Sequence, residues 1–269
     1  IIYVFWDDDR MEIFLFYILT GLAGGLIGGF LGLGGGIVFV PSLLLIFTSY
    51  NIYEGYELQS AIITSLGCVF ISSLSAMITH NKNNLILWDA FNKTSLGISV
   101  GVLIGIFLLS NSATESLKNL YSFLLIMISI FMIYQKTPKD KTRSKYKYVH
   151  SFSIFVGSIS TLLGIGGGTL TTPYFNFHGE DIKRSIATAS ACGVLIASVA
   201  IVSILIQNFI SEKNNLIALF SPSAFLCISI ASTFSASIGA SMTVKSKSRN
   251  LKLLFATSLV IVSLTILLN

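Results

Sequence analysis

The feature that most constrains the fold of this chain is a glycine-rich motif that occurs twice inside long apolar segments. The first copy, GLGGGIVFVP, covers residues 32–41, and the second, GIGGGTLTTP, covers residues 164–173. Three consecutive glycines weaken a helix, and broken backbone at membrane depth is tolerated only where protein buries it or it lines a solvated cavity. The two copies predict a duplicated membrane protein with a site for a polar solute.

The composition indicates that the surrounding medium is a lipid bilayer. Hydrophobic residues make up 53% of the 269 residues and charged residues only 11%, with a mean hydropathy of +0.81, whereas about 25% of residues are charged in soluble domains. The charges separate apolar segments at approximately 12–49, 58–79, 94–111, 117–135, 151–177, 185–210, 216–243 and 251–268. We therefore predict an all-α polytopic integral membrane protein with about eight transmembrane segments.

The chain divides into two homologous halves. We assign residues 1–135 to the first transmembrane repeat, 136–149 to a basic cytoplasmic linker and 150–269 to the second repeat. The first segment of each half is the one broken at the triple glycine. Because the first apolar run leads directly into the glycine motif, we expect no cleaved signal peptide, and we expect Met11 to be the natural start.

The distribution of Lys and Arg predicts how the halves are oriented. If each broken segment crosses the membrane, the basic residues divide ten against seven between the two sides. If each glycine break turns the chain back instead, fourteen of the 17 fall on the side of the linker. Because cytoplasmic loops hold the excess of Lys and Arg, we predict inverted repeats with both termini outside. The net charge of +5 then sets topology, and we expect no nucleic-acid partner.

The glycine breaks are the predicted binding site for a small anionic substrate. The first N–H groups of a helix are unpaired and carry partial positive charge, and glycine lets a ligand approach them. The predicted substrate-binding residues are Gly34, Gly35, Gly36, Gly166, Gly167, Gly168, Thr169, Thr64, Ser65, Thr188 and Ser190, with Thr171 and Thr172 as further hydroxyl donors. Thr64 and Thr188 occupy corresponding places in the two halves. Pro41 and Pro173 are predicted to be structural and to fix the bend after each break.

Other functional classes find little support in the sequence. The glycines lack the GK[ST] ending of a phosphate-binding loop, and the three histidines are scattered at segment ends. We predict no catalytic residues, no metal site and no cofactor, and hence no enzyme. The glycine rows that include Gly25 and Gly101 are expected to pack helices together.

The two glycine motifs, with SAIITSL after the first and SIATASA after the second, resemble the sulfite exporter TauE/SafE family over nearly the whole chain. The resemblance implies a multi-pass transporter in the inner (cytoplasmic) membrane that moves small sulfur-containing anions such as sulfite, thiosulfate or organosulfonates. Ala189 stands where Ser65 stands in the other half, so the two half-sites differ chemically. A transporter of another small anion, and a non-transporting assembly factor or sensor, remain alternatives, and the oligomeric state is open.

Overall fold

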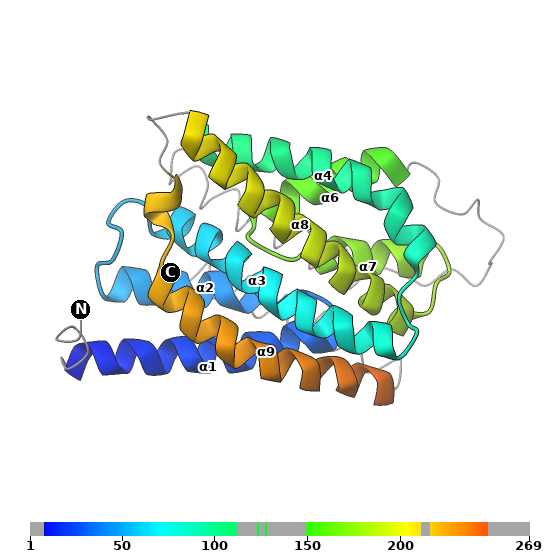
Figure 1. Ribbon diagram of the computed structural model, residues 1–269, viewed down its shortest axis with the longest axis horizontal. Coiled ribbons are helices and arrows are strands. Elements are labelled where there is room, and N and C mark those ends of the chain that lie inside the picture. The colour runs from blue at the N-terminus through cyan, green and yellow to red at the C-terminus, as the bar shows by residue number, and fades with distance from the viewer. Residues whose placement is uncertain (1–7, 112–122, 124–126, 128–148, 211–215, 247–269) are drawn as a thin grey trace.

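The computed structural model describes residues 8–111, 123, 127, 149–210 and 216–246, and within these ranges it is helical without any strand (Figure 1). The elements are α1 (Asp8–Leu31), α2 (Gly36–Ser49), α3 (Glu57–Lys82), α4 (Trp88–Asn111), α6 (Val149–Leu162), α7 (Gly168–Phe177), α8 (Ile182–Ile210), η2 (Leu216–Leu219) and α9 (Pro222–Lys245). Five of them, α1, α3, α4, α8 and α9, are long and apolar enough to cross a membrane. The predicted all-α polytopic membrane protein is confirmed.

Six of the eight predicted apolar segments fall within the described residues and are helical. The other two, 117–135 and 251–268, lie outside the described residues except for two single positions. The linker also lies outside them up to residue 148. The division of the chain into two repeats therefore stays a prediction.

Both broken segments turn back on themselves. The Tyr50 hydroxyl at the end of α2 donates to the Glu12 carboxylate near the start of α1 at 3.3 Å. The rings of Phe152 in α6 and Tyr174 in α7 stack with centroids 4.0 Å apart. α2 and α7 return toward opposite ends of the bundle (Figure 1). This geometry is the one that the distribution of basic residues favours, and the inverted duplication itself remains our interpretation.

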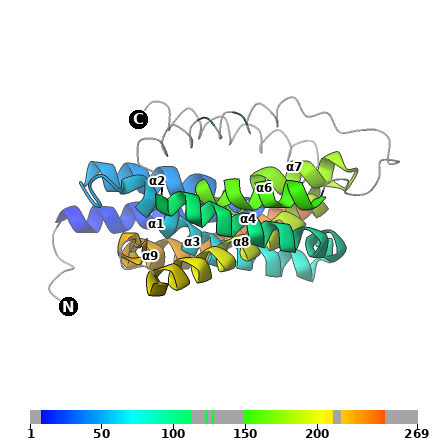
Figure 2. The ribbon, with the colours of Figure 1, turned by 90° about the horizontal axis from the view of Figure 1, so that it is seen from above.

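Small residues let two pairs of helices pack closely. A Cβ atom added at Gly25 would lie 2.7 Å from the Cα of Ser232 in α9, and one at Gly101 would lie 2.9 Å from the carbonyl carbon of Ile154 in α6. The helix pairs α1 with α9 and α4 with α6 therefore meet backbone to backbone. The predicted packing role of these glycine rows is confirmed. Figure 2 shows α2, α6 and α7 along one side of the bundle and α3, α8 and α9 along the other.

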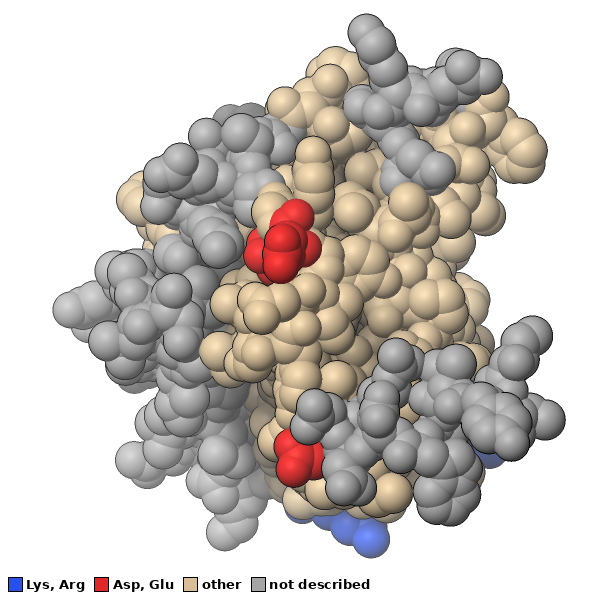
Figure 3. Space-filling model, turned by 90° about the vertical axis from the view of Figure 1, so that its left-hand side faces the viewer, with Lys and Arg blue, Asp and Glu red and all other residues tan. Residues whose placement is uncertain are grey.

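The charged side chains described from Met11 onward separate between the two ends of the bundle. The acidic end, where α1, α3 and α9 begin, carries Glu12, Glu54 and Glu57. Figure 3 looks at this end and shows acidic side chains on its surface. The basic end, where α3 and α9 finish and α4 and α8 begin, carries Lys82, Lys93, Lys183, Arg184 and Lys245, together with Asp89, Glu180 and Asp181. By the positive-inside rule, the basic end is the one expected to face the cytoplasm.

This orientation can be tested with single thiols in a Cys227→Ser background, because Cys68 and Cys192 are buried and Cys227 is half-buried. Glu54 and Asn83 are exposed in loops at the acidic and basic ends. In right-side-out vesicles, Glu54→Cys should react with an impermeant maleimide, and Asn83→Cys should react only after permeabilisation. The reverse pattern would show that the orientation is wrong.

Candidate functional site: the paired helix breaks

The two glycine breaks lie directly against each other. A Cβ atom added at Gly36 would collide with the carbonyl oxygen of Gly164, and one added at Gly168 would collide with that of Gly32. Each break therefore approaches the other with backbone only. Any larger residue at Gly36 or Gly168 would force the two breaks apart.

The contact lies near the middle of the bundle. The Gly166 N–H donates to the Leu33 carbonyl at 3.3 Å, which joins the two breaks by a hydrogen bond. The side chain of Val69 lies 3.1 Å from the Cβ position of Gly166, and a Cβ atom added at Gly193 would lie 2.8 Å from the Gly166 carbonyl oxygen. Val69 and Gly193 are central residues of the long helices α3 and α8.

Each short helix begins at the breaks without a side-chain cap. Gly35 and Gly167 precede α2 and α7 in the left-handed conformation, with φ of 81° and 73°, and neither helix has a side-chain hydrogen bond at this position. In α7 the N–H groups of Leu170 and Thr171 both donate to the Gly167 carbonyl, at 3.1 and 3.0 Å. The N–H groups of Gly168 and Thr169, which come before them, therefore make no hydrogen bond within the helix. In α2 the N–H groups of Val38 and Phe39 donate to the Gly35 carbonyl in the same way. Two positive helix ends therefore meet at the breaks.

Five buried hydroxyls without hydrogen-bond partners lie on the helices that form the breaks and on α3 beside them. They belong to Ser72 and Ser73 of α3, Ser160 of α6, and Thr169 and Thr172 of α7, and all five residues are fully buried. The Ser73 hydroxyl lies against Gly34, and the Ser160 hydroxyl lies 3.6 Å from the Cβ position of Gly167. A buried polar group without a partner costs about 1–3 kcal/mol. Several in one region indicate that a ligand or water completes them.

The described part of the site contains hydrogen-bond donors and no fixed charge. From Met11 onward, the described Asp, Glu, Lys and Arg residues lie in loops or near helix ends. The described part of the chain contains no group of three His, Cys, Asp or Glu residues that could bind a metal ion. Positive helix ends and neutral hydroxyls suit an anion, because they favour negative charge without neutralising it.

Several of the predicted binding residues come together here. Gly34–Gly36 and Gly166–Gly168 form the contact itself, and the unpartnered Thr169 hydroxyl lies in the first turn of α7. Ser65 is beside them, since its hydroxyl donates to the Gly164 carbonyl at 2.9 Å. Its role in binding and that of the glycines stay predictions.

The other predicted hydroxyls have structural partners. Thr64 accepts a hydrogen bond from the Ser221 N–H at 3.0 Å, and Thr188 accepts one from the Leu87 N–H at 2.9 Å. The two threonines thus fix the starts of α9 and α4 in equivalent ways. The Ser190 hydroxyl donates to the carbonyl four residues earlier in its own helix, at 3.2 Å. We do not include these three residues in the site proposed below.

The two prolines lie inside the short helices. Pro41 and Pro173 are buried in α2 and α7, which continue past them to Ser49 and Phe177. Proline has no N–H, so it cannot donate to the carbonyl four residues earlier, which in α7 belongs to Thr169. The structural role that we predicted for both prolines remains untested.

Ser72, Ser73 and Ser160 were not among the predicted residues. A periodicity signal existed, because Ser72 follows Ser65 by seven residues and therefore shares its face of α3. Ser160 precedes Gly164 by four residues, one helical turn before the break. None of the three serines belongs to a recognisable motif, and only the fold shows that Ser73 and Ser160 lie against the breaks.

The fold and the site together define a class of protein: a polytopic membrane protein with two broken helices that meet in its interior, as in many transporters. The chain belongs to the sulfite exporter TauE/SafE family, whose profile matches residues 17–266. It is a membrane transporter of this family, and the predicted resemblance is confirmed.

Three relatives carry the description of a probable membrane transporter protein. The Haemophilus influenzae protein is 26% identical over 260 residues, which cover 95% of this chain and 98% of the relative. The Methanocaldococcus jannaschii protein is 27% identical, with 93% and 94% covered. The YunE protein of Bacillus subtilis is 27% identical over 60% of this chain and 66% of its own length. No solved structure matches the chain significantly.

Substitution of the break glycines should abolish transport. In Gly35→Val and Gly167→Val, a branched side chain must adopt positive φ and meets the ring of Phe39 or the side chain of Ile196. Gly55→Val is the matched control, because Gly55 has φ of 78° and open space around it.

All three variants carry a backbone cost of about 1–3 kcal/mol, and only the first two disturb the breaks. Membrane insertion and substrate flux should both be measured. Normal flux in Gly35→Val and Gly167→Val, or equal loss in Gly55→Val, would show that the breaks have no special role.

Proposed function

We propose that this protein exports small sulfur-containing anions, such as sulfite, thiosulfate or organosulfonates, across the inner cell membrane. The observation that carries the proposal is the set of unpartnered buried hydroxyls at the positive starts of α2 and α7, namely Ser73, Ser160 and Thr169. A bound oxyanion would accept hydrogen bonds from hydroxyl and N–H groups together. The description of the family as sulfite exporters supports a sulfur oxyanion as the substrate.

The chemistry of the site favours an anion over a cation. A divalent cation takes carboxylate and carbonyl oxygens as ligands, and no Asp or Glu described from Met11 onward lies near the breaks. Positive helix ends also repel cations. A small carboxylate fits the same donors, and it is the alternative substrate that the flux measurement below must exclude.

The direction of transport follows from membrane voltage. When the cell interior is negative, the loss of one negative charge is favourable by about 2.3 kcal/mol per 100 mV. Export of an anion therefore proceeds without a coupled ion. This direction suits a site whose described residues include no ionisable side chain to carry a coupled proton. The chain moves its substrate without chemical change, so we propose no catalytic step and no cofactor.

The proposal predicts saturable, voltage-dependent flux. Proteoliposomes loaded with labelled sulfite should release it through the purified protein, and an interior potential of −100 mV should lower the internal level of a monovalent anion about fifty-fold at equilibrium. Thiosulfate and sulfoacetate should compete, and acetate should not. Flux that acetate inhibits more strongly than any sulfur anion would support the carboxylate alternative. No flux from correctly inserted protein would contradict the proposal.

The hydroxyl of Thr169 should contribute to affinity and not to stability. Thr169→Val removes a donor without changing the shape of the side chain, and a hydrogen bond to a charged group contributes about 1.5–3 kcal/mol, or roughly 10- to 150-fold in affinity. Because this hydroxyl has no partner within the protein, the thermal midpoint should be unchanged or higher.

Thr171→Val is the matched control for this variant. The hydroxyl of Thr171 is buried and donates to the Gly167 carbonyl at 3.0 Å, so it already has a partner in the protein. It should change substrate affinity much less than Thr169→Val. A lower thermal midpoint with unchanged affinity in Thr169→Val would assign that hydroxyl a structural role.

A further inference from the structure

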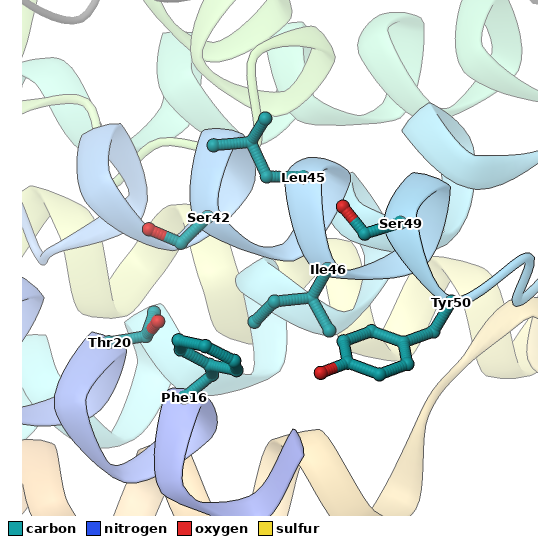
Figure 4. Close-up of a pocket in the computed structure, with 7 residues that line it drawn as sticks. All are labelled: Phe16, Thr20, Ser42, Leu45, Ile46, Ser49 and Tyr50. Atoms are coloured by element: carbon teal, nitrogen blue, oxygen red, sulfur yellow. The ribbon is translucent and has the colours of Figure 1, made fainter. Parts of the chain in front are cut away.

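A groove of about 580 Å³ lies between α1 and α2 at the acidic end. Its lining residues are Phe16, Thr20, Ser42, Leu45, Ile46, Ser49 and Tyr50. Figure 4 shows Thr20 and Ser42 facing each other across the groove. Phe16 and Ile46 lie between this pair and Tyr50. The lining thus combines hydroxyl groups with apolar side chains, and none of its seven residues is charged.

The groove leads toward the glycine break. Gly24 follows Thr20 by one helical turn on α1, and Phe39 precedes Ser42 by three residues on α2, so both lie on the faces that line the groove. The ring of Phe39 is fully buried and packs against Gly24 and Gly35. The Phe39 ring therefore contacts both the face of α1 that continues from the groove and the break itself.

The equivalent route in the second half is filled. The two glycine motifs are 132 positions apart, so Thr20 corresponds to Phe152 and Ser42 to Tyr174. The rings of Phe152 and Tyr174 stack at 4.0 Å with an interplanar angle of 12°, and Tyr174 is buried. Where the first half has an open space between two hydroxyl residues, the second half has an aromatic pair.

Resting on the proposed function, we propose that the groove between α1 and α2 is a vestibule site for a small oxyanion on its way out. Phe39 closes the inner end of this vestibule, and the stacked Phe152 and Tyr174 close the equivalent route at the basic end. In this proposal the structure represents the conformation that is open toward the acidic end. Rocking of one half against the other would open the second route as the first closes.

The lining fits an anion with a short carbon chain. The hydroxyls of Thr20 and Ser42 offer donors to the oxygens, and Phe16, Leu45 and Ile46 offer an apolar surface to the carbon chain of an organosulfonate. Glu12 lies at the mouth, where its carboxylate accepts a hydrogen bond from Tyr50. A negative charge there slows capture of anions from the acidic side without changing the voltage-driven equilibrium.

The test is the reactivity of single thiols toward a small anionic reagent, sulfonatoethyl methanethiosulfonate. Nanodiscs leave both ends accessible, so the comparison does not depend on orientation. In a Cys227→Ser background, Ser42→Cys and Thr20→Cys should react at least about tenfold faster than Leu22→Cys. Leu22 is two residues from Thr20 but lies on the exposed outer face of α1. Tyr174→Cys should react as slowly as Leu22→Cys, and a second change, Phe152→Ala, should accelerate it.

Flux through prelabelled protein completes the test. Proteoliposomes made from labelled Ser42→Cys protein should have lost sulfite efflux, whereas those from labelled Leu22→Cys protein should keep it. Equal labelling rates at positions 42 and 22, or full flux after complete labelling of Ser42→Cys, would overturn the vestibule. Equal rates at positions 42 and 174 would overturn the closed basic end. Absence of sulfite flux in the unlabelled wild type would contradict the proposed function instead, while the labelling rates would still test the groove.

Discussion

The structure depends on one constraint: backbone polar groups exposed by a helix break inside an apolar medium need partners. Here the two breaks are hydrogen-bond partners of each other. The Gly166 N–H bonds the Leu33 carbonyl, and glycine at positions 36 and 168 lets the two backbones touch. This contact brings two positive helix starts to the middle of the bundle. The same requirement that forces the breaks together leaves N–H groups and hydroxyls for which we propose an anion as the partner.

The two predicted halves differ in their chemistry. Thr64 and Thr188 fix the starts of α9 and α4 by matching hydrogen bonds. The unpartnered hydroxyls break this equivalence, since Thr169 and Thr172 correspond to Ile37 and Val40 in the first copy. The start of α7 is therefore polar and that of α2 is apolar. In the proposed function, such a site would hold one anion asymmetrically, and each half would contribute differently to access from its own end.

The sequence predicted the helical membrane fold and the position of both breaks, because triple glycines and apolar length act locally. The rows that include Gly25 and Gly101 were correctly assigned to packing for the same reason. The hydroxyls were harder to assign. Thr64 and Thr188 were predicted to donate to a ligand, which stays a prediction, and only the tertiary structure shows that they also accept hydrogen bonds from backbone N–H groups. Ser73 and Ser160 could not be selected, because a serine in an apolar helix usually bonds its own preceding turn.

The most direct measurement of the central claim is the position of a bound anion. Selenite is a heavier analogue of sulfite, and its anomalous scattering would locate it in crystals of the purified protein. The account predicts a peak at the contact of the two breaks, within hydrogen-bond distance of the Thr169 hydroxyl or the first N–H groups of α7. A saturable selenite site elsewhere, with the breaks unoccupied, would contradict it.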